Sequence, residues 1–114
     1  MSMMDMFGML GKAKEVQSRI QKFKEDAVKI TVVGEAGGGL VKVTVNGKKH
    51  TVAISIDPSL LKTEDATILQ DFIIAATNKA IIEMEGVLKV ELQKQTEGLI
   101  PNIPGFDLGQ LINS

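Results

Sequence analysis

A cluster of glycines is the first part of the sequence whose spacing suggests chemistry. Four glycines fall within residues 34–39, and Gly47 precedes two lysines and the only histidine. Glycine-rich loops bind phosphates when a helix follows them, because the helix N-terminus presents backbone amides and a favourable dipole to the anion. Here the residues after both glycine groups alternate as strands do, and Gly47-Lys48 lacks the upstream glycine of a P-loop. We therefore interpret these glycines as connections within a sheet.

Groups suited to catalysis or metal binding are sparse. The chain has no cysteine, and His50 is its only histidine, which excludes cysteine ligands and paired histidines. The adjacent acids Glu64 and Asp65 suit the first turn of a helix, whereas Glu83 and Glu85 do not share a helix face. We find no Ser/His/Asp set and no metal-ligand spacing. The sequence therefore predicts a protein that is not an enzyme, with no cofactor and no evident small-molecule substrate.

Basic charge is concentrated in the first half of the chain, although the net charge is −1. Residues 1–30 carry six basic against four acidic side chains, residues 31–56 three against one, and residues 57–114 four against nine. Trp and Tyr are absent, so the usual aromatic platform for unpaired bases is missing. The basic residues from 12 to 24 are compatible with a solvated helix flank or with DNA contacts. Residues 48–50 are likewise compatible with a solvated tip or with a small phosphate contact.

The first thirty residues have the period of a helix with a narrow apolar seam. Apolar side chains recur at alternating spacings of three and four, as the a and d positions of a heptad do. The seam consists of Met6, Met9, Ala13, Val16, Ile20, Phe23, Ala27 and Ile30. The pattern predicts a helix over residues 4–28.

The middle of the chain changes to the period of two that is typical of half-buried strands. Valines alternate with polar residues over 41–45, and a similar pattern covers 52–56. Asn46-Gly47 between them is a strong hairpin signal, and a shorter strand is expected near residues 29–33. Residues 29–56 are thus predicted to form a three-stranded antiparallel meander.

A second helix is predicted over residues 64–97, with Thr63 as its N-cap. It is interrupted only by Gly86, where a bend or the close approach of another backbone is expected. Residues 98–114 hold two of the three prolines and are expected to be a flexible tail. The whole chain, residues 1–114, is predicted to be a single α+β domain. No secretory signal or membrane span is evident, so a cytoplasmic protein is expected.

The predicted helix lengths favour a homodimer. At ~1.5 Å per residue the two helices span ~37 and ~50 Å, whereas a compact domain of this length is only ~30–35 Å across. The helices must therefore project beyond the sheet, and their apolar faces need a cover from each other or from a second copy. The residues expected in this dimer or core seam are Val16, Ile20, Phe23, Ile73, Ala76 and Ala80.

The order and spacing of four segments resemble one family of proteins. They are MFGMLGKAKEVQSRIQ (6–21), GEAGGGLVKVTVNGKKHTVAISIDPSLL (34–61), AATNKA (75–80) and PNIPGF (101–106). Together they cover nearly the whole chain, and it resembles the YbaB/EbfC family of bacterial nucleoid-associated proteins. The resemblance implies an α-β-β-β-α chain that forms a tweezer-like homodimer with two long projecting helices.

The same resemblance implies binding to double-stranded DNA with low sequence specificity, in the cytoplasm at the nucleoid, and an effect on nucleoid organisation or gene expression. It attributes DNA contact to the projecting helices. Carried onto this sequence, the DNA-binding residues are Lys12, Lys14, Arg19, Lys22 and Lys24 in the first helix and Lys79 and Lys89 in the second. The second helix is otherwise acidic. An alternative function is that of a non-enzymatic protein–protein adaptor, in which the heptad seam and the apolar C-terminal tail dock partner helices.

Overall fold

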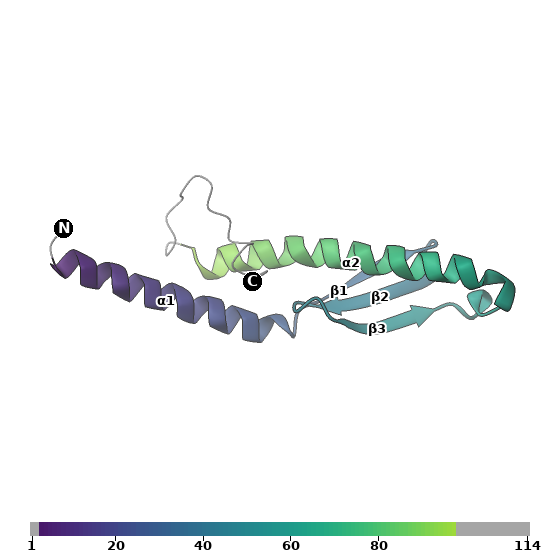
Figure 1. The fold of residues 1–114 in the computed structure, drawn as a ribbon, viewed down its shortest axis with the longest axis horizontal. Helices are drawn as coiled ribbons and strands as arrows, with labels where there is room; N and C mark the ends of the chain where they lie inside the picture. The colour runs from purple at the N-terminus through teal and green to yellow at the C-terminus, as the bar shows by residue number, and fades with distance from the viewer. Residues whose placement is uncertain (1–2, 98–114) are drawn as a thin grey trace. The chain divides into compact units, whose positions relative to one another are not determined.

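The computed structural model describes residues 3–97. It contains helix α1 (Met3–Ala27), strands β1 (Thr31–Ala36), β2 (Val41–Asn46) and β3 (Thr51–Ile56), and helix α2 (Ala66–Gln95) (Figure 1). The strands form an antiparallel sheet in the order β1-β2-β3. The predicted α-β-β-β-α order and three-stranded antiparallel sheet are confirmed. The predicted tail, residues 98–114, lies outside the described residues.

The described residues belong to two compact units. One is Ala27–Leu88, which contains the sheet and most of α2. The other contains residues 3–26 of α1 and residues 89–97, which include the end of α2. The first unit holds a conventional hydrophobic core, and the second holds the basic residues of α1.

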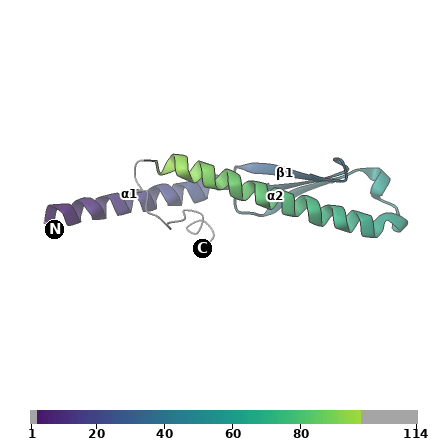
Figure 2. The same ribbon diagram turned by 90° about the horizontal axis from the view of Figure 1, so that it is seen from above.

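The core of the first unit lies between the sheet and α2. Val41, Val43 and Val45 on the central strand are fully buried, because their strand has a neighbour on each side and α2 on this face. The residues between them face the opposite side, as the alternation in the sequence predicts. Figures 1 and 2 show α2 running alongside the sheet. Ala76 and Ala80 of α2 are also fully buried.

Gly34 determines how closely α2 approaches the sheet. It lies within β1, opposite Val43, and not in the connection after β1 as we expected from the glycine cluster. A Cβ atom at this position would overlap the carbonyl oxygen of Ala76 and would lie 2.7 Å from the Ala80 nitrogen. The missing side chain therefore allows the backbones of β1 and α2 to come into contact.

The β1–β2 connection uses its glycines for their backbone conformation. Gly37, Gly38 and Gly39 have φ angles of 65°, 66° and 91°, in the left-handed region that residues with a Cβ rarely adopt. The Leu40 amide donates a hydrogen bond to the Gly37 carbonyl oxygen at 3.3 Å. This connection is a tight turn with no helix after it, which agrees with our interpretation of the glycine cluster.

The β2–β3 connection is wider than a two-residue hairpin turn. It covers residues 47–50, and the ladder has an irregularity next to it, where Thr44 pairs with Ala53 but Val45 pairs with Thr51. The residue with positive φ is Lys49, at 62°, and not Gly47. Asn46-Gly47 correctly indicated the hairpin, but Gly47 does not supply the positive φ angle that a primed turn requires.

Two short 3₁₀ turns, Pro58–Leu60 and Thr63–Asp65, precede α2. Asp57 caps the first of them, and its Oδ1 accepts a hydrogen bond from the Ser59 backbone N–H at 2.9 Å. This hydrogen bond lowers the pKa of the Asp57 carboxyl from its ordinary value. The predicted cap at Thr63 is wrong, since Thr63 lies inside the second turn and α2 begins at Ala66.

Helix α2 continues without interruption through Gly86. A Cβ atom at Gly86 would meet no other atom within 4 Å. The close backbone approach that we expected there is therefore not found among residues 3–97.

Candidate nucleic-acid interface

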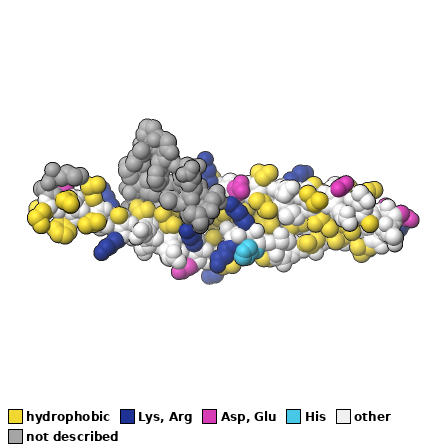
Figure 3. All heavy atoms as spheres, viewed as in Figure 1, with side chains coloured by type: hydrophobic (Ala, Val, Ile, Leu, Met, Phe, Trp, Pro, Cys, Tyr) yellow, Lys and Arg dark blue, Asp and Glu magenta, His cyan; other side chains and the backbone are white. Residues whose placement is uncertain are grey.

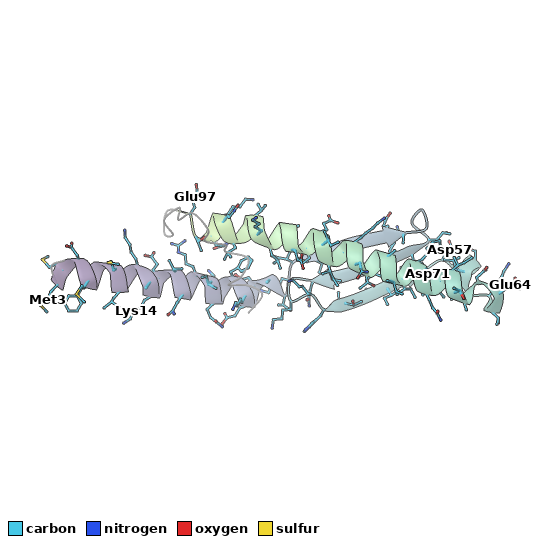
Figure 4. All side chains as sticks on the ribbon, turned by 45° about the horizontal axis from the view of Figure 1, so that its top comes forward. Met3, Lys14, Asp57, Glu64, Asp71 and Glu97 are labelled. Carbon is cyan, nitrogen blue, oxygen red and sulfur yellow. The ribbon has the colours of Figure 1, made fainter. Side chains whose placement is uncertain are left out.

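The predicted DNA-binding residues of α1 lie on the surface of one helix. Lys12, Lys14, Arg19 and Lys22 are exposed, and Lys24 is partly exposed. Figure 4 shows Lys14, labelled, extending away from α1. Since α1 is a continuous helix over these positions, the basic groups rise along it at ~1.5 Å per residue.

Arg19 differs from the lysines because it has partners in the same unit. Its Nη2 lies 3.6 Å from Glu15 Oε1, one helical turn earlier. Its Nη1 donates a hydrogen bond to the backbone oxygen of Gln95, at the end of α2, over 3.3 Å. Both side chains of the ion pair are about half exposed, at 49% and 50%, so the pair contributes little to stability. Arg19 therefore joins α1 to the last turn of α2 and still reaches solvent.

The predicted basic residues of α2 do not form one group. Lys79 and Lys89 are both exposed, but Lys89 belongs to the unit that contains the α1 residues, and Lys79 belongs to the unit that contains the sheet. Lys94 lies 3.5 Å from Glu91. The structure thus places Lys89 in the same unit as the basic residues of α1, and Lys79 in the other unit.

The apolar seam of α1 changes from exposed to buried along the helix. Met6 and Met9 are 55% and 58% exposed, Val16 and Ile20 are partly buried, and Phe23 is only 4% exposed. The half of the seam near the N-terminus therefore has no cover within the described chain.

The seam residues predicted on α2 lie in the part of that helix that runs along the sheet. Ala76 and Ala80 are in contact with Gly34 of the sheet, and Ile73, on the same helix, is partly buried. The small side chains do permit close packing, but the surface against which they pack belongs to the same chain. Ala76 and Ala80 are therefore residues of the core.

A second set of basic residues lies at the β2–β3 end of the sheet. Lys29, Lys48 and His50 are exposed there, whereas Lys49 is partly buried and its Nζ lies 3.5 Å from Glu85 Oε1. The sequence drew attention to residues 48–50 but gave no reason to connect them with Lys29. Lys29 lies near residues 48–50 because the turn contacts Ala27, the residue that ends α1.

The described residues show neither a metal-ligand cluster nor a membrane span. Within residues 3–97, no three or more His, Cys, Asp or Glu side chains are grouped so that they would hold a metal ion. Neither helix in this range is both long and apolar enough to cross a bilayer.

Comparison with known proteins identifies the family. Residues 3–99 match the YbaB/EbfC DNA-binding family. The chain is 46% identical over 106 residues to a nucleoid-associated protein of Bartonella tribocorum, covering 93% of this chain and 98% of that protein. It is 42% identical over 106 residues to a nucleoid-associated protein of Brucella anthropi, with the same coverage. The fold is similar to that of an uncharacterized protein from Helicobacter pylori, with a TM-score of 0.57, 28% identity, and coverage of 66% of this chain and 87% of that one. The chain therefore belongs to the YbaB/EbfC DNA-binding family.

Proposed function

We propose that this protein is a nucleoid-associated protein that binds duplex DNA as a homodimer, with low sequence specificity, mainly through phosphate contacts. It acts in the cytoplasm at the nucleoid, where it affects nucleoid organisation or gene expression. Membership of a DNA-binding family supports DNA as the partner. The names of the relatives in Bartonella and Brucella support association with the nucleoid.

The observation that carries phosphate binding is the exposed basic surface of α1. Lysine and arginine side chains at positions 12, 14, 19, 22 and 24 reach solvent from one helix. They supply positive charge to the DNA backbone, and four of the five are lysines, which neutralise phosphates as point charges. A surface of this kind favours affinity without sequence preference. Because the basic groups are concentrated in the first half of the chain, a protein of net charge −1 still presents a positive region, which occurs twice in a dimer.

Salt dependence provides the test of this proposal. We expect micromolar or tighter binding to duplex DNA at ~50 mM salt, and at least ~100-fold weaker binding at ~200 mM, because neutralising phosphates releases condensed counterions. Fluorescence anisotropy with two labelled duplexes of unrelated sequence would measure both salt dependence and specificity. The proposal is wrong if no binding is detected at low salt, and low specificity is wrong if the two affinities differ by more than about tenfold.

The uncovered part of the α1 seam supports the homodimer. A second copy of the helix would bury the apolar side chains near Met6 and Met9 together with the exposed sides of Val16 and Ile20, as in a coiled coil.

Replacing Val16 and Ile20 together with Glu is expected to weaken dimerisation at least tenfold, because the dimer would then bury unpaired carboxylates. Sedimentation equilibrium measures the monomer–dimer constant directly. The control is Gln17→Glu together with Gln21→Glu, which adds the same charge to exposed positions of α1. Equal dimerisation of the two variants would show that the seam is not the interface.

A second candidate function, that of a protein–protein adaptor, is favoured by the apolar start of α1. Met3, Met4, Phe7 and Leu10 are all more than half exposed. Such a surface is typical of a partner-binding site. The apolar C-terminal tail that would join it in this function lies outside the described residues. A dimer without salt-dependent affinity for DNA would favour the adaptor.

A further inference from the structure

The β2–β3 turn has a fixed backbone. Asn46 is only 6% exposed, and its Oδ1 accepts hydrogen bonds from the amides of Lys48 at 2.9 Å and His50 at 3.2 Å. The backbone N–H of Asn46 donates a hydrogen bond to the backbone carbonyl oxygen of His50 at 3.0 Å. The backbone N–H of Lys49 donates to the backbone carbonyl oxygen of Asn46 at 2.8 Å. The side chains of Lys48 and His50 therefore project from a backbone that is held in place by these four hydrogen bonds.

Gly47 seats this turn against the last residue of α1. Its amide donates a hydrogen bond to the Ala27 carbonyl oxygen at 3.0 Å. A Cβ atom on Gly47 would overlap that oxygen and would lie 2.8 Å from the Ala27 Cβ. Because Lys29 follows Ala27 by two residues, and Thr31 pairs with Asn46, the contact brings Lys29 to the same end of the sheet as Lys48.

The lysines at this end of the unit are mostly unneutralised. Lys49 forms an ion pair with Glu85. Lys29, Lys48 and His50 have no Asp or Glu oxygen within 4.0 Å among residues 3–97, and all three are exposed. Figure 3 shows the only histidine of the protein, in cyan, at the surface. The three side chains, here named the turn patch, are thus available to an anion.

The opposite end of the same unit is acidic. Asp57, Glu64 and Asp71, labelled in Figure 4, lie toward the end of the sheet away from the β2–β3 turn. Lys62 is the only basic residue within residues 57–71, and Lys42, at the same end of the sheet, lies 3.8 Å from Glu35. A body with positive charge at one end and negative charge at the other is oriented by a polyanion, which attracts the first and repels the second.

We propose that the turn patch is a second DNA-contacting surface, distinct from the basic residues of α1, which binds the phosphate backbone of the duplex. This inference rests on the proposed function, and it adds a contact from the sheet to those from α1. The fixed turn presents its cations with little loss of backbone entropy on binding, because the backbone is already ordered. Its two lysines act on phosphates as point charges, and the contacts of the patch contribute affinity rather than sequence preference.

The test removes charge from the turn patch without disturbing α1. The Lys29→Ala/Lys48→Ala variant is expected to bind duplex DNA about threefold to tenfold more weakly at ~100 mM salt. The slope of log affinity against log salt should fall by about one for each phosphate that the variant no longer neutralises. The matched control is Lys42→Ala/Lys62→Ala, which removes the same charge from the same unit at other positions. The control is expected to retain the wild-type slope. An unchanged slope in the turn variant, or an equal decrease in the control, would overturn the inference.

A second variant predicts a gain in affinity. Glu85→Gln removes the carboxylate next to the turn and is expected to raise DNA affinity about twofold to threefold at low salt, since the local potential becomes more positive. Glu83→Gln, on a different face of α2, should have a smaller effect. Affinity that is unchanged or reduced by Glu85→Gln argues against the turn patch.

The outcomes separate this inference from the proposed function. If the wild-type protein binds no DNA at low salt, both are wrong. If it binds, and substitution of the α1 residues abolishes binding while the turn variants behave as wild type, only the turn patch is wrong.

Discussion

Replacing Lys12, Arg19 and Lys22 together with Glu is expected to lower the affinity for duplex DNA at least ~100-fold at ~50 mM salt. Each substitution exchanges a positive charge for a negative one on the exposed surface of α1, so it removes an attraction to phosphate and adds repulsion. The dimer should remain intact, because these side chains lie outside the apolar seam. Anisotropy titration measures the affinity, and sedimentation equilibrium measures the dimer.

A second variant separates loss of charge from loss of the contacts that Arg19 makes with Glu15 and the Gln95 carbonyl oxygen. The Lys12→Glu/Lys14→Glu/Lys22→Glu variant leaves these interactions in place and should reduce the affinity by a comparable factor. Wild-type affinity in both variants would show that α1 is not the DNA-binding surface. A reduction confined to the first variant would assign the effect to the position of Arg19.

Gly34→Val is expected to destabilise the fold by about 3 kcal/mol or more. The added side chain would overlap the backbone of α2 at Ala76, and its Cβ would lie 2.9 Å from that of Ala80. Because the obstacle is helix backbone and not a flexible side chain, a rotamer change offers no relief. Urea unfolding monitored by circular dichroism gives the free energy of unfolding.

Gly86→Ala is the matched control for this substitution. Its Cβ would meet nothing within 4 Å in the described part of the chain, so the exchange should stabilise α2 by up to about 1 kcal/mol. If Gly34→Val unfolds at the same urea concentration as the wild type, β1 and α2 do not make the contact described here.

The regular elements follow from periodicity in the sequence. The seam from Met6 to Ala27 correctly predicted α1, and the alternating valines of residues 41–45 correctly predicted β2. Gly34 was misplaced because local reasoning associates a glycine beside other glycines with a turn. Its actual role depends on α2, more than forty residues later in the chain, and no local pattern contains that contact.

The candidate site was only partly predictable for the same reason. The charge distribution and the family resemblance drew attention to the basic residues of α1, and the structure shows them exposed or, at Lys24, partly exposed on one helix. That Arg19 contacts the end of α2, and that Lys29 lies at the same end of the sheet as Lys48, depend on tertiary contacts at Gln95 and Ala27. Ala76 and Ala80 pack closely against Gly34, but small size alone does not distinguish a second copy from the chain's own sheet.

The buried side chain of Asn46 has a further consequence, for the chemical ageing of the protein. Asn-Gly sequences lose ammonia readily when the glycine nitrogen attacks the side-chain amide carbon and closes a succinimide. In the folded protein the Gly47 nitrogen donates to Ala27, and the Asn46 oxygen accepts two amides, so neither group is placed to react. Deamidation is therefore confined to molecules in which the turn has opened. Water then hydrolyses the succinimide to isoaspartate or aspartate, and either product adds a negative charge at the end of β2. The fraction of Asn46 that is deamidated in an aged sample therefore measures how often the turn opens.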